Sequence, residues 1–168
     1  MIKEVLPDQA SRFRFARVLR ALVKERVSIT SWEDILETVR ESGLATKNES
    51  EVVRLVRLKL REYLPGNTLG SRRLPLPPET ERKIAPWIWR ENGKAFLSLP
   101  PEETQELLSD IRGLVDPNDK KIVLVTHDAE LRPFIRRLVE LEHPDLMVIS
   151  QDELISEEEM METAKLAE

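Results

Sequence analysis

Several residue types are scarce in this chain, and each scarcity removes a class of function. There is no cysteine, so disulfides, thiolate catalysis and cysteine-ligated metal sites are excluded. The chain has only five glycines, and none belongs to the Gly-x-x-x-x-Gly-Lys loop that cradles nucleotide phosphates. The two histidines, His127 and His143, stand far apart among scattered acids, which makes a poor metal site. We therefore expect no cofactor and no bound metal.

Long apolar runs are also missing. No segment approaches the roughly 20 residues that a membrane-spanning helix needs, and the first five residues do not have the pattern of a signal peptide. The net charge is −5, with 13 basic and 10 acidic side chains in residues 1–64 and 13 basic and 21 acidic ones in 65–168. We expect a soluble chain of 168 residues without a broad surface for nucleic acid.

Residues 1–66 have the pattern of a helical subdomain. Apolar residues at helical spacing predict a helix over 9–26, capped by Asp8, and a second one from about Ser31 to Gly43. Thr30 and Glu33 have the spacing of a capping box for that second helix. A third helix is predicted over 50–64. The inward residues of the three helices are predicted to be Phe15, Val18, Leu19, Leu22 and Val23, then Trp32, Ile35, Leu36 and Val39, then Val52, Val53, Val56, Leu60 and Tyr63.

Residues 67–78 are rich in glycine and proline and predict a connector. Arg72 to Pro78 also matches a polyproline ligand pattern, but we favour a stiff interdomain segment.

Residues 79–155 predict a small α/β subdomain. A short helix over 79–85 precedes two apolar runs joined by Asn92-Gly93, the strongest short signal for a hairpin. A helix follows over 100–115. The strand-like run 122–125, the amphipathic segment 128–141 and the run 146–149 then predict a βαβ unit. Residues 156–168 predict an acidic C-terminal tail or frayed helix. The fold class is therefore mixed α/β, a three-helix subdomain followed by a small α/β subdomain.

The segment from Ile122 to Asp128 is the most tempting catalytic motif, because it looks like a strand followed by a phosphate-contacting histidine. Without a glycine-rich loop, we interpret His127 as a solvated turn residue, with Thr126 or Asp128 capping the next helix. A small α/β enzyme remains an alternative that would require Thr126, His127 and Ser150 to converge at one sheet edge.

The third helix carries four basic residues, Arg54, Arg57, Lys59 and Arg61, and could imitate a DNA-reading helix. Since they do not share one face, a DNA-binding regulator is a second alternative only. Three aromatic residues, Trp87, Trp89 and Phe96, are predicted to pack in the core or at an interface rather than around a ligand.

Four segments, in order along the chain, resemble the family of type III secretion and flagellar export-gate proteins. The first is VLRALVKERVSI at 18–29 followed by WEDILE at 32–37, and it departs from the family's sequence pattern at Thr30-Ser31. The others are FLSLPPE at 96–102, IVLVTHD at 122–128 continuing into LRPFIRRL at 131–138, and PDLMVISQDEL at 144–154.

This resemblance implies a location and partners that the residues alone do not reveal. Such proteins combine a membrane-embedded N-terminal half with a cytosolic C-terminal half at the cytoplasmic face of the bacterial inner membrane. The cytosolic half forms a homo-oligomeric ring, usually a nonamer, and docks secretion chaperones, substrates and sorting factors. This chain would match only the third and fourth cytosolic subdomains, with no enzymatic role and no membrane contact of its own. Flagellar and virulence systems both remain open.

Within this interpretation, the polar faces of the first two helices are the candidate subunit interface. Opposite charges across a head-to-tail contact can set the register of a ring. The candidate residues are Arg17, Arg20, Lys24, Glu25, Arg26, Glu33, Asp34 and Glu37.

Overall fold

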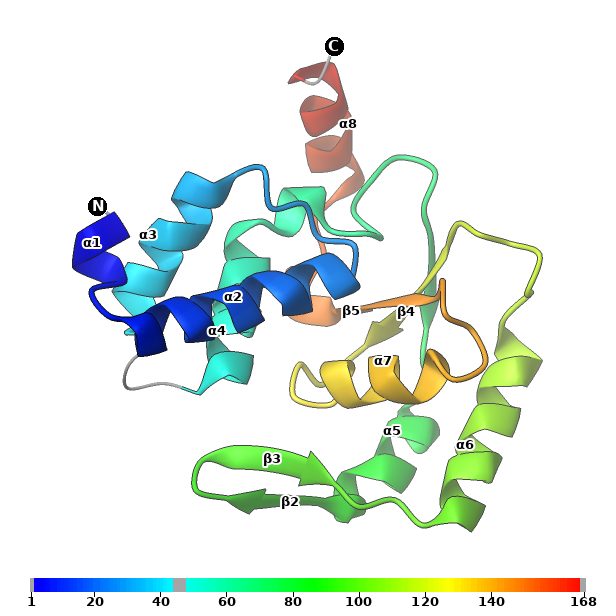
Figure 1. Ribbon diagram of the computed structural model, residues 1–168. Helices are drawn as coiled ribbons and strands as arrows, with labels where there is room; N and C mark the ends of the chain where they lie inside the picture. Colours follow the sequence, from blue (N-terminus) through cyan, green and yellow to red (C-terminus); the bar gives the residue numbers. More distant parts are fainter. Residues whose placement is uncertain (1, 44–47, 167–168) are drawn as a thin grey trace.

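The computed structural model describes residues 2–43 and 48–166. A helical region comes first, with α1 (Ile2–Val5), α2 (Gln9–Lys24), α3 (Trp32–Ser42), α4 (Glu49–Lys59) and the 3₁₀ turn η1 (Arg61–Tyr63). Next come β1 (Arg72–Pro75), α5 (Pro78–Ile84), η2 (Ala85–Trp87), β2 (Ile88–Glu91), β3 (Lys94–Leu97) and α6 (Pro101–Leu114). The chain continues with β4 (Ile122–Thr126), α7 (Arg132–Val139), β5 (Met147–Ser150), η3 (Gln151–Glu153) and α8 (Glu157–Leu166). Figure 1 shows α1 to α4 gathered on one side of the sheet and α5 to α7 on the other, with α8 projecting from the body.

The central sheet has the strand order β1-β4-β5, and both pairings are parallel. The predicted βαβ unit is confirmed as β4, α7 and β5. The strand β1 was not predicted, because its residues belong to the segment expected to be a stiff connector. Leu74 of β1 pairs with Leu124 of β4, so this segment is part of the sheet.

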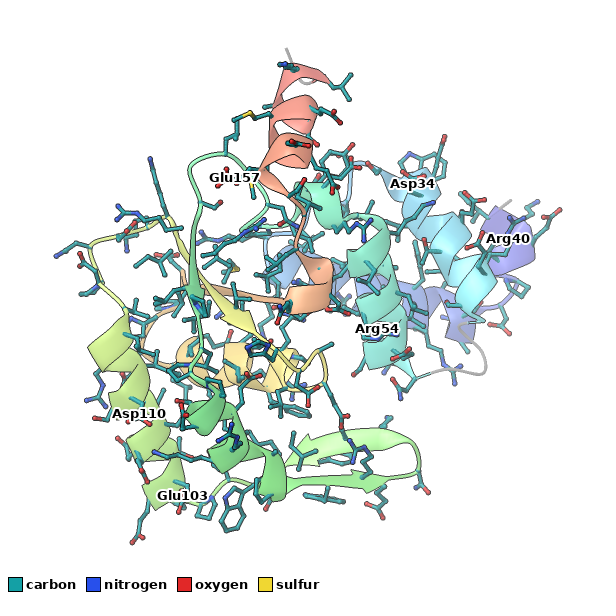
Figure 2. All side chains as sticks on the ribbon, turned by 180° about the vertical axis from the view of Figure 1, so that it is seen from behind. Asp34, Arg40, Arg54, Glu103, Asp110 and Glu157 are labelled. Carbon is teal, nitrogen blue, oxygen red and sulfur yellow. The ribbon has the colours of Figure 1, made fainter. Side chains whose placement is uncertain are left out.

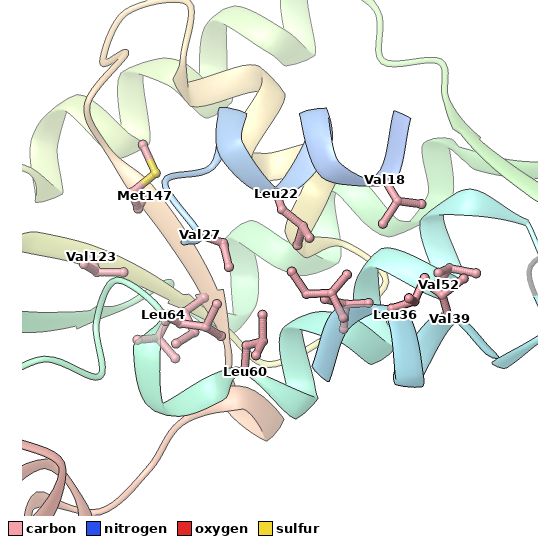
Figure 3. Close-up of a cluster of buried hydrophobic side chains, with 14 of the residues drawn as sticks. Val18, Leu22, Val27, Leu36, Val39, Val52, Leu60, Leu64, Val123 and Met147 are labelled. Carbon is pink, nitrogen blue, oxygen red and sulfur yellow. The ribbon is translucent and has the colours of Figure 1, made fainter. Parts of the chain in front are cut away.

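The two faces of the sheet belong to two different cores. Because successive strand residues point to opposite faces, Val123 and Val125 of β4 pack with the helical region, while Leu124 between them packs with α5, α6 and α7. Figure 3 shows the first core, in which side chains of α2, α3 and α4 lie against β4 and β5. The helical region therefore shares its hydrophobic core with one face of the sheet, and the boundaries drawn at 66 and 79 stay a prediction.

The helix α2 ends earlier than expected, and Val23 is exposed instead of inward-facing. Asp8 does cap its start, accepting a hydrogen bond from the backbone N of Ser11 at 2.7 Å. At the other end, the N–H groups of Arg26 and Val27 donate to the carbonyls of Val23 and Leu22. This is the bonding pattern of a Schellman motif, which stops the helix.

The capping box predicted for α3 is wrong. Ser31 occupies the N-cap without a side-chain hydrogen bond, and the hydroxyl of Thr30 contacts that of Ser28 at 2.9 Å instead of capping the helix. Gly43 terminates α3 in the left-handed conformation (φ 71°), as predicted. Trp32, expected to be inward, is exposed.

The helices α4 and α7 are shorter than the predicted 50–64 and 128–141. After Lys59 the chain tightens into η1, which leaves Tyr63 exposed rather than buried. Before α7, the buried carboxylate of Glu81 accepts hydrogen bonds from the backbone N–H groups of His127 and Asp128, which holds this stretch as a turn. Neither Thr126 nor Asp128 caps α7, contrary to expectation, since Leu131 is at its N-cap.

The hairpin of β2 and β3 is confirmed. Asn92 and Gly93 both have positive φ, 53° and 77°, as a two-residue type I′ turn requires. The predicted short helix and the helix over 100–115 are present as α5 and α6, and Met160 anchors α8 by a buried side chain. In the portion that the structure describes, no helix combines the length and apolarity needed to cross a membrane.

Candidate functional site

Most of the eight candidate interface residues lie on the outer surface of α2 and α3. Arg20 and Lys24 are exposed on α2, and Glu33 and Asp34 are exposed at the start of α3. Within the described part of the chain, none of these four side chains forms an ion pair or a side-chain hydrogen bond. In Figure 2, Asp34 and Arg40 mark the two ends of the α3 surface. The two helices thus present charges of opposite sign that are available for an external partner.

Two other candidates on these helices already have partners on the surface. Arg17 contacts Glu49 of α4 at 2.6 Å, and Glu37 contacts Arg40 one turn further along α3 at 3.6 Å. Both pairs are solvent-exposed, so each contributes little to stability.

Glu25 faces inward and is committed to a contact within the chain. Its carboxylate receives two hydrogen bonds from Arg132 of α7, at 2.6 and 2.9 Å, and only 14% of its side chain is exposed. Burial alone would raise the pKa of Glu25, but the hydrogen bond and the charge of Arg132 outweigh it, and the pKa lies below its ordinary value. Glu25 therefore ties the end of α2 to α7 and is not available to another subunit.

A second buried pair lies beside the first. Arg57 of α4 donates to both carboxylate oxygens of Glu153, at 2.7 and 3.1 Å, and both side chains are almost completely buried. Arg132 also approaches Glu153, with 3.9 Å between its Nε and the nearer oxygen. Burial again opposes ionisation of Glu153, while Arg57 and then Arg132 favour it, so that its pKa is also lowered. The result is an electrically neutral network of two arginines and two glutamates.

This network protects an edge of the sheet. Within the described strands, β5 is an edge strand, and the carbonyl of Val148 accepts hydrogen bonds from Arg57 and Arg132 at 3.3 and 3.2 Å. An uncovered strand edge invites pairing with other chains. Here guanidinium groups from α4 and α7 occupy that position.

Asn67 joins the same region from the loop after η1. Its amide nitrogen donates to the carbonyls of Arg61 and Glu153, at 2.7 and 2.8 Å, and its side-chain oxygen accepts from the backbone N of Ile155 and from Arg73. This buried amide thus joins residues on both sides of its own loop to Glu153 and Ile155, which are more than 80 positions away. It fixes η3 and the start of α8 against the helical region.

Arg26, the remaining candidate, has an unusual backbone conformation. It occupies the C′ position of the Schellman motif, with φ 59°, where glycine is the usual residue. A side chain in this left-handed region costs about 1–2 kcal/mol. The guanidinium of Arg26 forms an ion pair with Asp145 in the loop before β5. Its hydrogen bond and positive charge, followed by those of Lys120, lower the pKa of Asp145.

The residues proposed for enzyme chemistry do not converge. Thr126 and Ser150 are neighbours in the sheet register, but the Thr126 hydroxyl donates to the carbonyl of Asp128 and the Ser150 hydroxyl donates to Asp152. The His127 side chain is exposed, as predicted for a turn residue. No cluster of three or more metal-ligating side chains exists among residues 2–43 and 48–166.

The basic residues of α4 do not form a DNA-reading surface. Arg57 is buried against Glu153, and Arg54 is held by Glu51 through two hydrogen bonds at 3.1 and 2.8 Å. Two of the four basic side chains considered for DNA binding are thus neutralised within the chain.

The buried network was missed because its partners are distant in sequence. Arg57 and Glu153 are 96 positions apart, and Glu25 and Arg132 are 107 apart. The sequence did contain one signal that two of these arginines are buried. Arg57 follows Val53 by four positions on the inward face of α4, and Arg132 precedes Ile135 by three on that of α7, so both cations occupy positions that otherwise suit apolar residues.

Comparisons with known proteins agree with this fold. Residues 1–159 match the FHIPEP family. Invasion protein InvA of Salmonella typhimurium is 32% identical over 165 residues, covering 92% of this chain and 23% of that protein. Protein hrpC2 of Xanthomonas euvesicatoria is 30% identical over 160 residues, with coverages of 93% and 24%. Flagellar biosynthesis protein FlhA of Caulobacter vibrioides is 29% identical over 164 residues, with coverages of 92% and 23%. The chain thus spans about a quarter of the length of these relatives.

Solved structures show the same architecture. The C-terminal domain of InvA superposes with a TM-score of 0.77 at 29% identity, covering 90% of this chain and 48% of that one. The Chlamydia pneumoniae CdsV protein gives 0.78 at 27% identity, with coverages of 93% and 45%, and it has also been solved in complex with CdsO. The nonameric EscV cytosolic domain of a type III secretion system gives 0.73 at 21% identity, which shows the fold alone, and covers 93% of this chain and 46% of its own. Since the family match spans residues 1–159 and the fold is that of these cytosolic C-terminal domains, the chain belongs to the FHIPEP family of type III export proteins.

Proposed function

We propose that this chain is a non-catalytic, ring-forming segment of a type III protein-export gate. Its role is to supply contacts between subunits and a docking surface for export substrates, chaperones or sorting factors. The longer protein would hold it at the cytoplasmic face of the bacterial inner membrane. The nonameric EscV cytosolic domain, which shares this fold, supports assembly into a ring, and the CdsV–CdsO complex supports docking.

The observation that carries the subunit contact is the separation of charge between α2 and α3. Arg20 and Lys24 place positive charge on one helix, and Glu33 and Asp34 place negative charge on the next, all four without an ion pair in the described chain. In a head-to-tail arrangement, the basic face of one copy would meet the acidic face of the next. Such a contact closes a ring without needing a twofold axis.

Charge reversal tests this contact. Arg20→Glu should weaken self-association of the chain in sedimentation velocity, whereas Lys94→Glu, an equal change of charge at the tip of the hairpin, should leave it unaltered. Association that is indifferent to Arg20→Glu would contradict the proposed interface.

The docking surface is best placed on the hairpin and α7. Trp89 and Phe96 stack with ring centroids 4.6 Å apart and remain 46% and 39% exposed. Beside them is a cavity of about 260 Å³ between β3 and α7, bordered by Phe134 and Arg137. Exposed aromatic residues next to an arginine are typical of protein-binding hot spots. Trp89→Ala with Phe96→Ala should therefore weaken binding of purified secretion chaperones from the same system in calorimetry, and Trp32→Ala should not. If the double variant bound chaperones as tightly as the unaltered chain, the docking surface would not include Trp89 and Phe96.

A further inference from the structure

A second cavity, of about 230 Å³, lies at the opposite edge of the sheet from Thr126 and Ser150, where β4 and β5 begin. Val123 and Met147 contribute apolar surface to it, and the loop after η1 closes one side. This loop packs tightly, since a Cβ on Gly66 would lie 3.2 Å from a methyl group of Val123. The cavity is therefore bounded on one side by a tightly packed loop and on another by the first residues of β4 and β5.

Its rim is positively charged. Arg26, Lys120 and Lys121 line the cavity together with a single carboxylate, Asp145. Asp145 is already shared between Arg26 and Lys120, whose Nζ is 3.5 Å away. Among the residues that the structure describes, the ammonium of Lys121 has no hydrogen bond or ion pair. The rim thus carries an excess of positive charge that the chain itself does not neutralise.

Arg26 adds an independent observation. A glycine at this position would satisfy the Schellman motif without conformational cost, yet the chain has an arginine with φ 59° there. Strained residues of this kind are found preferentially at functional sites. The side chain of Arg26, present in spite of this backbone strain, lines the rim of the cavity.

The C-terminal helix has the complementary chemistry. The helix α8 carries four exposed carboxylates, Glu157, Glu158, Glu159 and Glu162, and the exposed side chain of Met161. The helix projects from the body in Figure 1, and Glu157 lies at its base in Figure 2. None of its described residues lines the cavity of its own chain.

We propose that the cavity bounded by Arg26, Lys120 and Lys121 binds the acidic helix α8 of a second copy of this chain. Glutamates of α8 pair with the cationic rim, and the exposed methionine meets the smaller apolar part of the lining. This contact is separate from the α2–α3 interface of the proposed ring. It adds a second link between neighbouring copies. It rests on the proposed function in one respect, which is that the chain associates with copies of itself.

The test uses the whole chain in sedimentation velocity, with Arg26→Gly as the first variant. Because glycine suits the backbone of residue 26, this variant should fold normally while its self-association weakens about tenfold through loss of a charged contact. Lys121→Glu should act in the same way, and combining it with Glu158→Lys should restore association. Lys94→Glu in the hairpin is the matched control for charge.

A synthetic peptide of residues 156–166 provides a second measurement. It should bind the chain in calorimetry with an affinity that falls as salt is raised, and its variant with glutamine at 157, 158, 159 and 162 should not bind. Unchanged association of both Arg26→Gly and Lys121→Glu, or binding of the glutamine peptide, would overturn the proposal. If Arg20→Glu alone disrupts association, the ring interface stands and only this second link fails.

Discussion

Arg57 on α4 and Glu153 in η3, 96 positions apart in the chain, form a two-bond ion pair from which water is almost completely excluded. Such a pair adds little stability compared with apolar residues of the same size, because both charges lose their hydration. Removing one partner is different, since it leaves a charge buried without a full counter-charge. The pair therefore links the helical region to the segment after β5, and loss of either side chain should destabilise this junction.

The variant Arg57→Met should lower the free energy of unfolding by about 3–5 kcal/mol, because it leaves Glu153 without its main partner. Adding Glu153→Gln should cost much less than the sum of the two single changes. Urea denaturation followed by circular dichroism measures both. Arg112→Met provides the control, since its pair with Glu142 has the same 2.7 Å distance but is half exposed, and its loss should cost under about 1 kcal/mol. Equal costs for the two arginines would show that burial of the network is unimportant.

Acid should weaken the same junction. The pKa values of Glu25 and Glu153 are lowered in the folded chain relative to their ordinary value of 4.5. Their stabilising contribution is therefore complete above the unfolded pKa and is lost as the pH falls through the folded values. The free energy of unfolding should decrease below about pH 4.5, and Glu25→Gln should flatten this decrease. Glu91→Gln, at an exposed carboxylate of the hairpin, should leave the profile unchanged. A wild-type profile that is level down to about pH 3 would contradict the assigned ion pairs.

Asn67 should be sensitive to truncation. Asn67→Ala removes partners from the backbone N of Ile155 and the carbonyl of Glu153, and a buried polar group without a partner costs about 1–3 kcal/mol. Hydrogen exchange at Ile155 should accelerate together with this loss of stability. Asn118→Ala, in an exposed turn, should change neither quantity.

Two glycines with positive φ, Gly66 and Gly93, allow the cost of backbone strain to be measured apart from the cost of steric crowding. Gly93→Ala should cost about 1 kcal/mol, because only the left-handed backbone disfavours a side chain there and a Cβ would meet nothing within 4 Å. Gly66→Ala carries both penalties, since its φ is 100° and its Cβ would press against Val123. Thermal unfolding should place Gly66→Ala below Gly93→Ala. The reverse order would show that the loop after η1 yields easily.

The elements that could be predicted from the sequence are those with a local signal. Asn92-Gly93 specifies its hairpin because few residue pairs accept two positive φ values, and the apolar runs of β4 and β5 identify strands buried on both faces. By contrast, β1 is a short segment between glycine and prolines, and it becomes a strand only because it pairs with β4, about fifty positions later. The position of Glu25 depends in the same way on Arg132, which no local pattern connects to α2.

The charge pattern of the sequence was sufficient to predict four exposed residues of the candidate interface. Arg20, Lys24, Glu33 and Asp34 are exposed as a surface contact requires. Glu25 carries a signal that separates it from them, because it follows Val18 by seven positions and Leu22 by three, which places it on the inward face of the helix. Its partner Arg132 is brought close only by the fold.

The most direct test of the subunit interface is a charge exchange between α2 and α3. Arg20→Glu and Glu33→Arg should each weaken self-association in sedimentation velocity, whereas the double variant should recover it, because each copy then offers the reversed charges to its neighbour. An equimolar mixture of the two single variants should also associate, because alternating copies then pair either the two introduced charges or the two original ones. Association that is unaffected by either single variant, or a double variant weaker than both, would contradict a ring contact between these two helices.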